Sequence, residues 1–368
     1  MSELGKYSHS KYSDPQLPAH WYFDDGVAAL EQRRLFESGP GYVGHELMVP
    51  HVGDYHTLSW QDDSHVLVRN ESGVLLLSNV CRHRQATVLH GCGKAKNLVC
   101  PLHRWTYGLD GRLLGAPHFQ EQPSLDLACI PVENWNGLLF RGPRSPKLDL
   151  QELGCFGELS VEGYVFQRVE TTEYHFNWKT FIEVFLEDYH VEPFHPGLSD
   201  FVDCWNIRWE MGCWYNVQTV PIKRGLRRAG SSTYRIWQDQ VLEYSKGILP
   251  KQGAIWLVYY PNVMIEWYPN TLIVSTVIPR GAGACSNVVE FYFPEDIVQN
   301  HPQYMDAQYR AYSETALEDQ VLCDRMTQGR RALVRQGLSQ VGPYQSPTED
   351  GLKHFHMFLH RELDPYVN

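Results

Sequence analysis

Short runs of apolar residues, each bounded by turn-forming residues, dominate the chain between residues 41 and 145. Five of these runs have the length and composition of strands: residues 46–50, 56–60, 65–69, 74–80 and 137–140. The residues Asn70-Glu71-Ser72-Gly73 separate two of the runs and are typical of a hairpin turn. This pattern predicts a small antiparallel β domain.

The pattern changes after residues 143–153, a polar and proline-containing stretch where we expect a domain boundary. Two later segments, rich in Trp and Tyr, are predicted to be strands: residues 157–176 and 204–293. Three segments have the apolar spacing of helices: residues 177–192, 302–336 and 349–363. Strands and helices in this arrangement predict an α+β fold, an antiparallel sheet with helices packed on it.

Two polar residues mark the expected starts of helices. Asp24 or Asp25 can cap a helix that runs to Glu37, and Asn177 can cap the helix that follows it. We expect Pro193 to end the second helix near residue 192. The chain is thus divided into an N-terminal segment (1–40) that packs on the last domain, a β domain (41–147) and an α+β domain (148–368).

Composition narrows the class of protein. The 368 residues are 43% apolar and 20% charged, which is typical of a folded chain, and the formal net charge of −11 argues against nucleic-acid partners and anionic membranes. The N-terminus lacks the apolar segment of a secretory signal, and no apolar run is long enough to span a membrane. We therefore expect a cytoplasmic protein with no membrane or nucleic-acid partner.

Two Cys-plus-His pairs form the first chemical motif. Cys81 and His83 are followed, after 16 intervening residues, by Cys100 and His103. A zinc finger would place its two Cys together and its two His together, whereas here each Cys is paired with a His. The spacing favours a Rieske [2Fe–2S] cluster, in which two imidazoles replace two thiolates on one iron.

A second motif follows Asn177. His190 and His195 lie five residues apart, with Pro193 between them and Pro196 directly after the second, so both imidazoles can reach one ion. Two neutral His and one carboxylate form the ligand set of non-heme Fe(II) oxygenases, which leaves positions open for O2 and substrate. A zinc hydrolase could use similar ligands, and two ordinary loop histidines are the simplest alternative.

These motifs resemble those of one family. The residues Cys81-Arg82-His83-Arg84, Cys100-Pro101-Leu102-His103-Arg104-Trp105-Thr106-Tyr107 and Leu109-Asp110-Gly111-Arg112-Leu113 are similar to the Rieske domain of Rieske non-heme iron oxygenases, in their catalytic α subunits. That superfamily includes aromatic ring-hydroxylating dioxygenases and choline- or betaine-type monooxygenases. Gln85 and Arg104 depart from the family pattern, which usually has Gly at both places.

The resemblance implies a third ligand for the second metal site. Glu318-Asp319, nine residues before Gln328-Gly329, is similar to the late acidic motif of the family, and Asp319 is the matching residue. Three nearby acids are rivals for this role, namely Glu314, Glu318 and Asp324. The resemblance also suggests four residues that support the iron site by contacts around the ligands: Asn177, Glu183, Asp188 and Tyr189.

Glu187 precedes His190 by three residues, so the two would share a face if both were helical. In the family, an acidic residue at this place bridges the first His to a Rieske His of a neighbouring subunit. The resemblance therefore implies an electron path from His103 of the partner subunit through Glu187 to His190. The simpler alternative is that Glu187 only orients His190.

Carried over to this chain, the resemblance implies a Rieske domain followed by a helix-grip catalytic domain, assembled as a homotrimer or a multiple of trimers. Each subunit would hold one [2Fe–2S] cluster and one Fe(II), with O2 as co-substrate. No G-x-G-x-x-G follows a predicted strand, so we expect no bound NAD or flavin. Electrons would come from a separate flavin and iron–sulfur reductase, with or without a ferredoxin.

The predicted activity is that of a terminal oxygenase that hydroxylates an aromatic or other small organic substrate. One alternative is oxidation or N-demethylation of a betaine-like quaternary ammonium compound. Glu266 could pair with such a cation, although we favour an outward-facing strand residue at this position. A second alternative is a non-catalytic electron carrier that has only the cluster.

Overall fold

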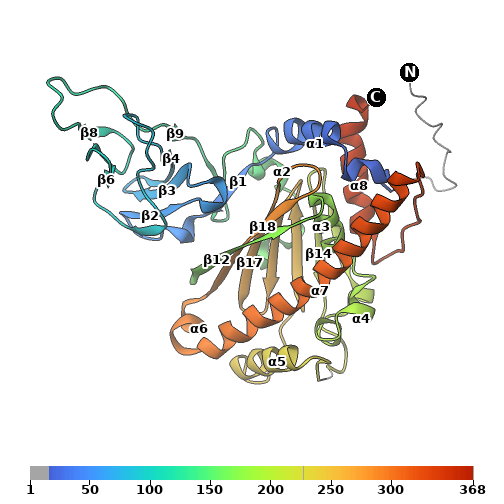
Figure 1. Cartoon of the computed structure of the whole chain (residues 1–368). Coiled ribbons are helices and arrows are strands. Elements are labelled where there is room, and N and C mark those ends of the chain that lie inside the picture. Colours follow the sequence, from blue (N-terminus) through green and yellow to red (C-terminus); the bar gives the residue numbers. More distant parts are fainter. Residues whose placement is uncertain (1–15, 227, 368) are drawn as a thin grey trace, which may run out of the picture. The chain divides into compact units, whose positions relative to one another are not determined.

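The computed structural model describes residues 16–226 and 228–367 (Figure 1). The prediction that residues 1–40 pack on the last domain therefore falls, for its first 15 residues, outside the described range. The chain divides into two compact units. Pro40–Leu148 form one unit, and the described residues up to Gly39 join those from Asp149 onward in the other.

The unit formed by Pro40–Leu148 contains three antiparallel sheets, which confirms the predicted small β domain. The largest sheet has, in spatial order, β5 (Cys92–Lys94), β2 (Asp54–Thr57), β3 (His65–Asn70), β4 (Gly73–Ser78) and β9 (Cys129–Ile130). A second sheet has β6 (Leu98–Val99), β7 (Thr106–Tyr107) and β8 (Leu113–Gly115). The third has β1 (Tyr42–His45), β11 (Leu138–Phe140) and β10 (Glu133–Trp135).

Local turns explain why one prediction for this unit is confirmed and another is wrong. The predicted hairpin is present, because Asn70 pairs with Gly73 and the Asn70 side chain accepts a hydrogen bond from the Ser72 amide at 2.9 Å. The predicted strand at 46–50 is wrong, because Glu46–Met48 form a 3-10 helix. His45 caps this helix by accepting from the Leu47 amide at 3.1 Å, an interaction that the apolar pattern does not reveal.

The other unit is built on one antiparallel sheet of seven strands, which confirms the predicted α+β architecture. In spatial order the strands are β12 (Tyr164–Tyr174), β18 (Cys285–Pro294), β17 (Thr271–Pro279), β16 (Val263–Tyr268), β15 (Ala254–Tyr259), β14 (Tyr215–Val220) and β13 (Arg208–Met211). The helices are α1 (Asp25–Glu31), α2 (Pro146–Asp149), which crosses the boundary between the units, α3 (Trp178–Phe185), α4 (Val191–Phe194), α5 (Ser232–Tyr244), α6 (Glu295–Asn300), α7 (Pro302–Arg335) and α8 (Asp350–Leu363). Figure 1 shows α7 running across this sheet.

Helix α5 lies inside a segment that we predicted to be strands, so this part of the prediction is wrong. Its content of Tyr, Ile, Trp and Val favours strands. Two helix signals are nevertheless present: Ser231 accepts a hydrogen bond from the Tyr234 amide at 3.0 Å, and Tyr234, Trp237 and Val241 are buried at helical spacing. These side chains pack with α7 residues on one face of the sheet.

The helix that begins after Asn177 is shorter than expected. Its cap is confirmed, since the Asn177 side chain accepts from the Lys179 amide at 2.9 Å. However, α3 ends at Phe185, and the Asp188 amide donates to the Thr348 carbonyl at 2.9 Å instead of continuing the helix. Pro193 lies in the first turn of α4, where a missing N–H costs nothing. His190 is therefore the N-cap of α4 and not part of the last turn of α3.

Among the described residues, no helix is long and apolar enough to cross a membrane.

Candidate active site

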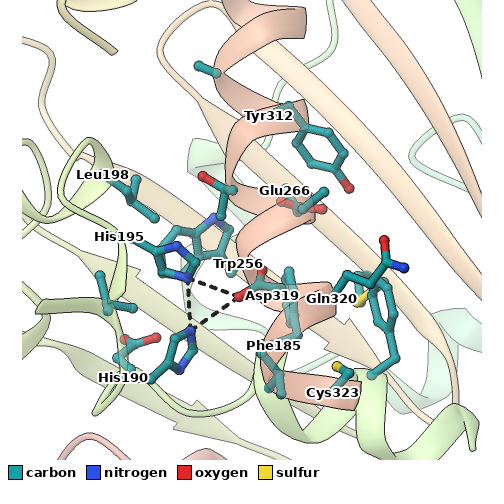
Figure 2. A pocket seen from close by; sticks show the side chains of 18 of the residues that line it. Phe185, His190, His195, Leu198, Trp256, Glu266, Tyr312, Asp319, Gln320 and Cys323 are labelled. Carbon is teal, nitrogen blue, oxygen red and sulfur yellow. Dashed lines mark hydrogen bonds and ion pairs between the residues drawn. The ribbon is translucent and has the colours of Figure 1, made fainter. Parts of the chain in front are cut away.

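The structure brings His190, His195 and Asp319 to one point, as Figure 2 shows. His190 caps α4, His195 follows its last residue, and Asp319 lies in α7. The Nε2 atoms of the two imidazoles are 3.0 Å apart, and Asp319 Oδ1 lies 2.9 Å from His195 Nε2 and 3.4 Å from His190 Nε2. Two imidazoles and one carboxylate that face a common point fit the ligand set of a mononuclear Fe(II).

The charges of these three groups are coupled. Burial lowers the pKa of His190, but hydrogen bonds to Asp319 and Glu187 outweigh burial and raise this pKa to about 10. Burial opposes ionisation of Asp319, yet its hydrogen bonds with both imidazoles hold its pKa below the ordinary value. Because a metal ion binds neutral imidazoles, its binding would displace the protons that the triad otherwise shares.

The other acidic residues of α7 lie in different places. Glu318 Oε2 lies 2.6 Å from His195 Nδ1, the ring nitrogen that faces away from the triad, so it can orient this imidazole. Asp324 is exposed to solvent. Glu314 is partly exposed and does not belong to the triad. The geometry therefore favours Asp319 over its three rivals as the proposed third ligand.

Glu187 contacts His190 at two points, with Oε1 2.6 Å from Nδ1 and Oε2 accepting from the backbone amide at 3.1 Å. The predicted contact between Glu187 and His190 is therefore present. The two residues do not share a helix face, however, because residues 186–190 form a turn and not a helix. Glu187 also borders a surface depression that includes His190, Tyr189 and Trp205. It is thus the acidic residue that links the first imidazole to the molecular surface.

A cavity extends from the triad to the sheet. Its wall consists largely of aromatic and aliphatic side chains from α3, α5, α7, β15 and β16. Four acidic residues line it, namely Glu187, Asp188, Glu266 and Asp319, and among the described residues neither lysine nor arginine does. Burial raises the pKa of Asp188 to about 8.

Glu266 corrects one of our sequence interpretations. We expected it to face solvent, but only 2% of its surface is exposed and its side chain lines the cavity (Figure 2). It pairs with Trp256 of β15 and Ile273 of β17, which also belong to the packed face of the sheet. A one-residue difference in register decides which face a strand residue occupies, and the sequence alone did not establish it.

The four residues of the predicted Rieske motif lie on two loops with the same hydrogen-bond pattern. The amides of Cys81 and Cys100 each donate to the carbonyl five residues later, at 2.8 Å. The amides of Gln85 and Arg104 each donate back to the Cys carbonyl, at 3.1 Å. Gln85 and Arg104 have φ values of 55° and 61°, so they adopt the left-handed conformation for which Gly is favoured.

The side chains on these loops fit a [2Fe–2S] cluster. Cys81 and Cys100 are buried, whereas the Nδ1 atoms of His83 and His103 face each other at 3.2 Å near the surface. The Tyr107 hydroxyl lies 3.4 Å from Cys81 Sγ, a contact that would tune the potential of a cluster held there. Cys81, His83, Cys100 and His103 are therefore the proposed cluster ligands.

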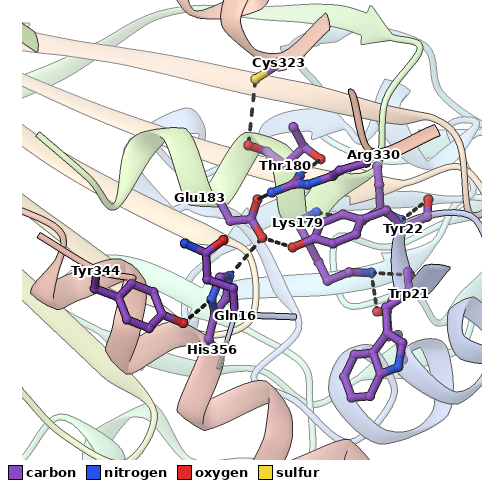
Figure 3. Close-up of polar contacts among 12 residues, drawn as sticks. Gln16, Trp21, Tyr22, Lys179, Thr180, Glu183, Cys323, Arg330, Tyr344 and His356 are labelled. Carbon is purple, nitrogen blue, oxygen red and sulfur yellow. Dashed lines mark hydrogen bonds and ion pairs between the residues drawn. The ribbon is translucent and has the colours of Figure 1, made fainter. Parts of the chain in front are cut away.

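Asn177, Glu183 and Tyr189 lie outside the cavity wall. Asn177 caps α3, and Tyr189 is exposed beside Trp205. Glu183 belongs to a buried polar network, in which it accepts from Tyr22 and Arg330 and contacts His356, as Figure 3 shows. Of the four supporting residues suggested by the sequence, Asp188 is the one that lines the cavity.

The same network holds the N-terminal segment in place. The Lys179 ammonium lies 2.5 Å from Glu31 Oε1 and donates to the Trp21 carbonyl at 3.1 Å. The side chains of Lys179 and Glu31 are 0% and 2% exposed, so this ion pair is fully desolvated. A buried pair of this kind contributes little net stability, but removing one partner is costly.

We predict that Glu31→Gln will lower the free energy of unfolding by about 3–5 kcal/mol, because it leaves the Lys179 charge buried without its partner. Denaturant titration will measure this change. Glu37→Gln, at an exposed position of the same segment, is the control and is expected to change stability by less than about 0.5 kcal/mol. Equal effects of the two substitutions would contradict the prediction.

We predict that Asp319→Ala will remove the mononuclear iron and leave the cluster intact. Iron should fall from about three to about two atoms per chain, while acid-labile sulfide stays at about two. Asp324→Ala, five residues further along α7 and exposed, is expected to retain all of the iron. Metal analysis of anaerobically purified protein tests this, and full iron content in Asp319→Ala would rule out Asp319 as a ligand.

Both units match domains of known proteins. Residues 41–131 match the Rieske [2Fe-2S] domain, and residues 162–364 match the catalytic domain of the ring-hydroxylating alpha subunit. The chain is 56% identical to putrescine 2-hydroxylase of Ralstonia nicotianae, over 99% of this chain and 100% of that protein. It is 28% identical to the chloroplastic choline monooxygenase of Beta vulgaris, over 94% of this chain and 76% of that protein.

Solved structures share the fold. A quaternary ammonium Rieske monooxygenase superposes with a TM-score of 0.75 at 20% identity, over 94% of each chain. Naphthalene 1,2-dioxygenase from Rhodococcus sp. superposes with a TM-score of 0.72 at 18% identity, over 96% of this chain and 95% of that one. The chain therefore belongs to the Rieske non-heme iron oxygenases, as an oxygenase component with a Rieske [2Fe–2S] cluster and a mononuclear Fe(II) for O2 activation.

Proposed function

We propose that this oxygenase hydroxylates a small aliphatic diamine, with 1,4-diaminobutane (putrescine) as the first substrate to test. The observation that carries the proposal is the lining of the cavity, in which Glu266 is a buried carboxylate away from the imidazoles and, among the described residues, no lysine or arginine is present. A substrate with two ammonium groups would supply the missing positive charge. The full-length similarity to a putrescine 2-hydroxylase supports the same substrate class.

A second candidate is a compound with a trimethylammonium group. Four aromatic residues line the cavity near the sheet and could hold such a group by cation–π contacts: Trp237, Trp256, Tyr268 and Tyr312. An arene, the other class expected from the sequence, would fit the aromatic wall but would leave Glu266 buried without a cation. The charge of the cavity therefore favours an amine.

The proposed reaction consumes O2, two electrons and two protons for each substrate molecule. One oxygen atom enters a C–H bond to form an alcohol, and the other leaves as water. The iron supplies an open position for O2 when it is bound. The residues of this chain orient the metal ligands through Glu187 and Glu318, and the apolar wall excludes bulk water from the reacting carbon.

The electrons are proposed to come from a separate reductase that uses NAD(P)H, with or without a ferredoxin, and to enter at the Rieske cluster. We propose a homotrimer in which His103 of the partner subunit approaches Glu187 at the surface depression beside His190. This proposal is supported by the position of Glu187, which lines both the cavity and the depression. A non-catalytic carrier would not need the His190, His195 and Asp319 triad.

We predict that the holoenzyme, supplied with a surrogate reductase, will convert 1,4-diaminobutane to a hydroxylated diamine with matching O2 uptake. A trimethylammonium compound and an arene serve as comparison substrates, and each product is identified by mass spectrometry. His190→Ala is the control, which should keep the colour of the cluster but form no product. Hydroxylation of the arene without turnover of the diamine would contradict the proposal.

We predict that Glu187→Gln will keep both metal centres but slow reoxidation of the reduced cluster by about tenfold or more in a single turnover, because the carboxylate that contacts His190 is lost. Stopped-flow absorbance of the cluster measures this rate. Asp200→Asn is the control, because Asp200 follows His195 by five residues and does not line the cavity; this variant is expected to react at the wild-type rate. Reoxidation at the wild-type rate in Glu187→Gln would exclude the bridging role.

A further inference from the structure

We propose that Glu266 determines substrate specificity by binding the ammonium group that lies away from the triad, with the Trp256 ring beside it. This inference rests on the proposed function and adds the residue that would distinguish a diamine from a monoamine. Two features of Glu266 carry the argument: its position in the cavity and, within the part of the chain that the structure describes, the absence of a cationic partner.

Glu266 belongs to the sheet, whereas the other three acidic residues of the cavity belong to α7 or to the turn after α3. Asp319 contacts both imidazoles, Glu187 contacts His190, and Asp188 is adjacent to Glu187 in the chain. These three carboxylates are therefore at the triad end of the cavity. Glu266 is the acidic residue of the opposite wall, next to Trp256 in the neighbouring strand.

The hydrogen bonds that reach Glu266 come from hydroxyl groups. Tyr268 donates to Oε2 at 2.9 Å, and Ser275 lies 3.3 Å from Oε1 and is itself 2.9 Å from the Tyr312 hydroxyl. Hydroxyl donors orient a carboxylate but do not neutralise it. Burial accordingly raises the pKa of Glu266 to about 7, despite the hydrogen bonds from Tyr268 and Ser275.

Two other buried acids of this unit, Glu183 and Glu31, are neutralised by the protein itself. Glu183 has the Arg330 guanidinium at 2.6 Å, and Glu31 has the Lys179 ammonium at 2.5 Å. A buried carboxylate without a cation is costly, so its presence in a cavity indicates a charge that arrives from outside. Glu266 differs from Glu183 and Glu31 in this respect among the described residues.

Trp256 completes the proposed subsite. Its side chain lines the cavity, and its strand position is directly opposite Glu266 on the same face of the sheet. A carboxylate beside an aromatic ring binds an ammonium group by charge and by cation–π contact together. With one end of the diamine held there, the carbon chain extends toward the triad, so the subsite would also determine which C–H bond reacts.

Equilibrium binding to the anaerobic holoenzyme tests the proposal, with 1,4-diaminobutane and butylamine as paired ligands. We expect Glu266→Gln to weaken binding of the diamine by about 10–100-fold and binding of the monoamine by less than about threefold, because only the diamine has a second charge to lose. In steady-state assays the KM for the diamine should rise, with a smaller change in kcat.

Glu290→Gln is the matched control. Glu290 is also a buried acid of the same sheet. Glu266 pairs with Ile273, whereas Glu290 pairs with Val274, the next residue of the same strand. Because successive residues of a strand point to opposite faces, the two acids lie on opposite faces of the sheet. This variant should bind both amines as the wild type does. Cluster absorbance and thermal unfolding establish that each variant is folded and loaded.

A second variant, Glu266→Asp, tests the inference even if Glu266→Gln fails to fold. Glu266→Asp keeps the charge but withdraws it by one methylene, so the preference should shift from 1,4-diaminobutane toward 1,5-diaminopentane. Unchanged diamine binding in Glu266→Gln, or an unchanged chain-length preference in Glu266→Asp, overturns this inference alone. Failure of the wild-type enzyme to bind or hydroxylate either diamine overturns the proposed function as well.

Discussion

The site depends on one imidazole that is held at both of its nitrogens by consecutive residues of a single helix. Glu318 contacts Nδ1 of His195 and Asp319 contacts Nε2, at 2.6 and 2.9 Å. Adjacent residues on a helix point about 100° apart, so this arrangement requires His195 to lie directly against α7. The turn after α3 then brings His190 within 3.0 Å of the same point, and Glu187 orients it from the surface side.

The acidic residues of the triad and of the adjacent cavity differ in how their charge is offset. A divalent iron offsets part of the acidic charge around the triad, but Glu266 is on the far wall, where the hydrogen bonds from the described residues come from hydroxyl groups. Aromatic and aliphatic residues form most of the remaining surface, which suits an apolar carbon chain as well as a cation. The cavity thus has an acidic wall at one end, an apolar middle and the metal site at the other end. This arrangement fits the proposed substrate, which is charged at its termini and reacts at a carbon between them.

The sequence predicted the chemistry more reliably than the local structure. Ligand spacing predicted the Cys81–His103 loops, and spacing together with the family resemblance predicted the His190–His195 pair, because metal sites constrain residue type and separation directly. The end of α3 and the existence of α5 were predicted wrongly, because tertiary contacts determine them: the Thr348 carbonyl accepts the Asp188 amide, and α7 covers Tyr234 and Trp237. The orientation of Glu266 depends on strand register, and Glu183 was assigned to the iron site although its partners Arg330 and His356 are more than 140 residues away.

Helix α7 has a further property that follows from its length. Asp319 and Arg330 are eleven residues apart, close to three helical turns, so they project from the same side of one continuous helix. Arg330 contacts Glu183 and Thr180 of α3, and Tyr22 of the N-terminal segment meets the same Glu183 (Figure 3). The same continuous helix therefore carries the proposed iron ligand Asp319 and, about three turns later, the Arg330 side chain that contacts Glu183. A substitution at Tyr22 therefore alters the surroundings of Arg330 on the helix that carries Asp319, although Tyr22 does not line the cavity.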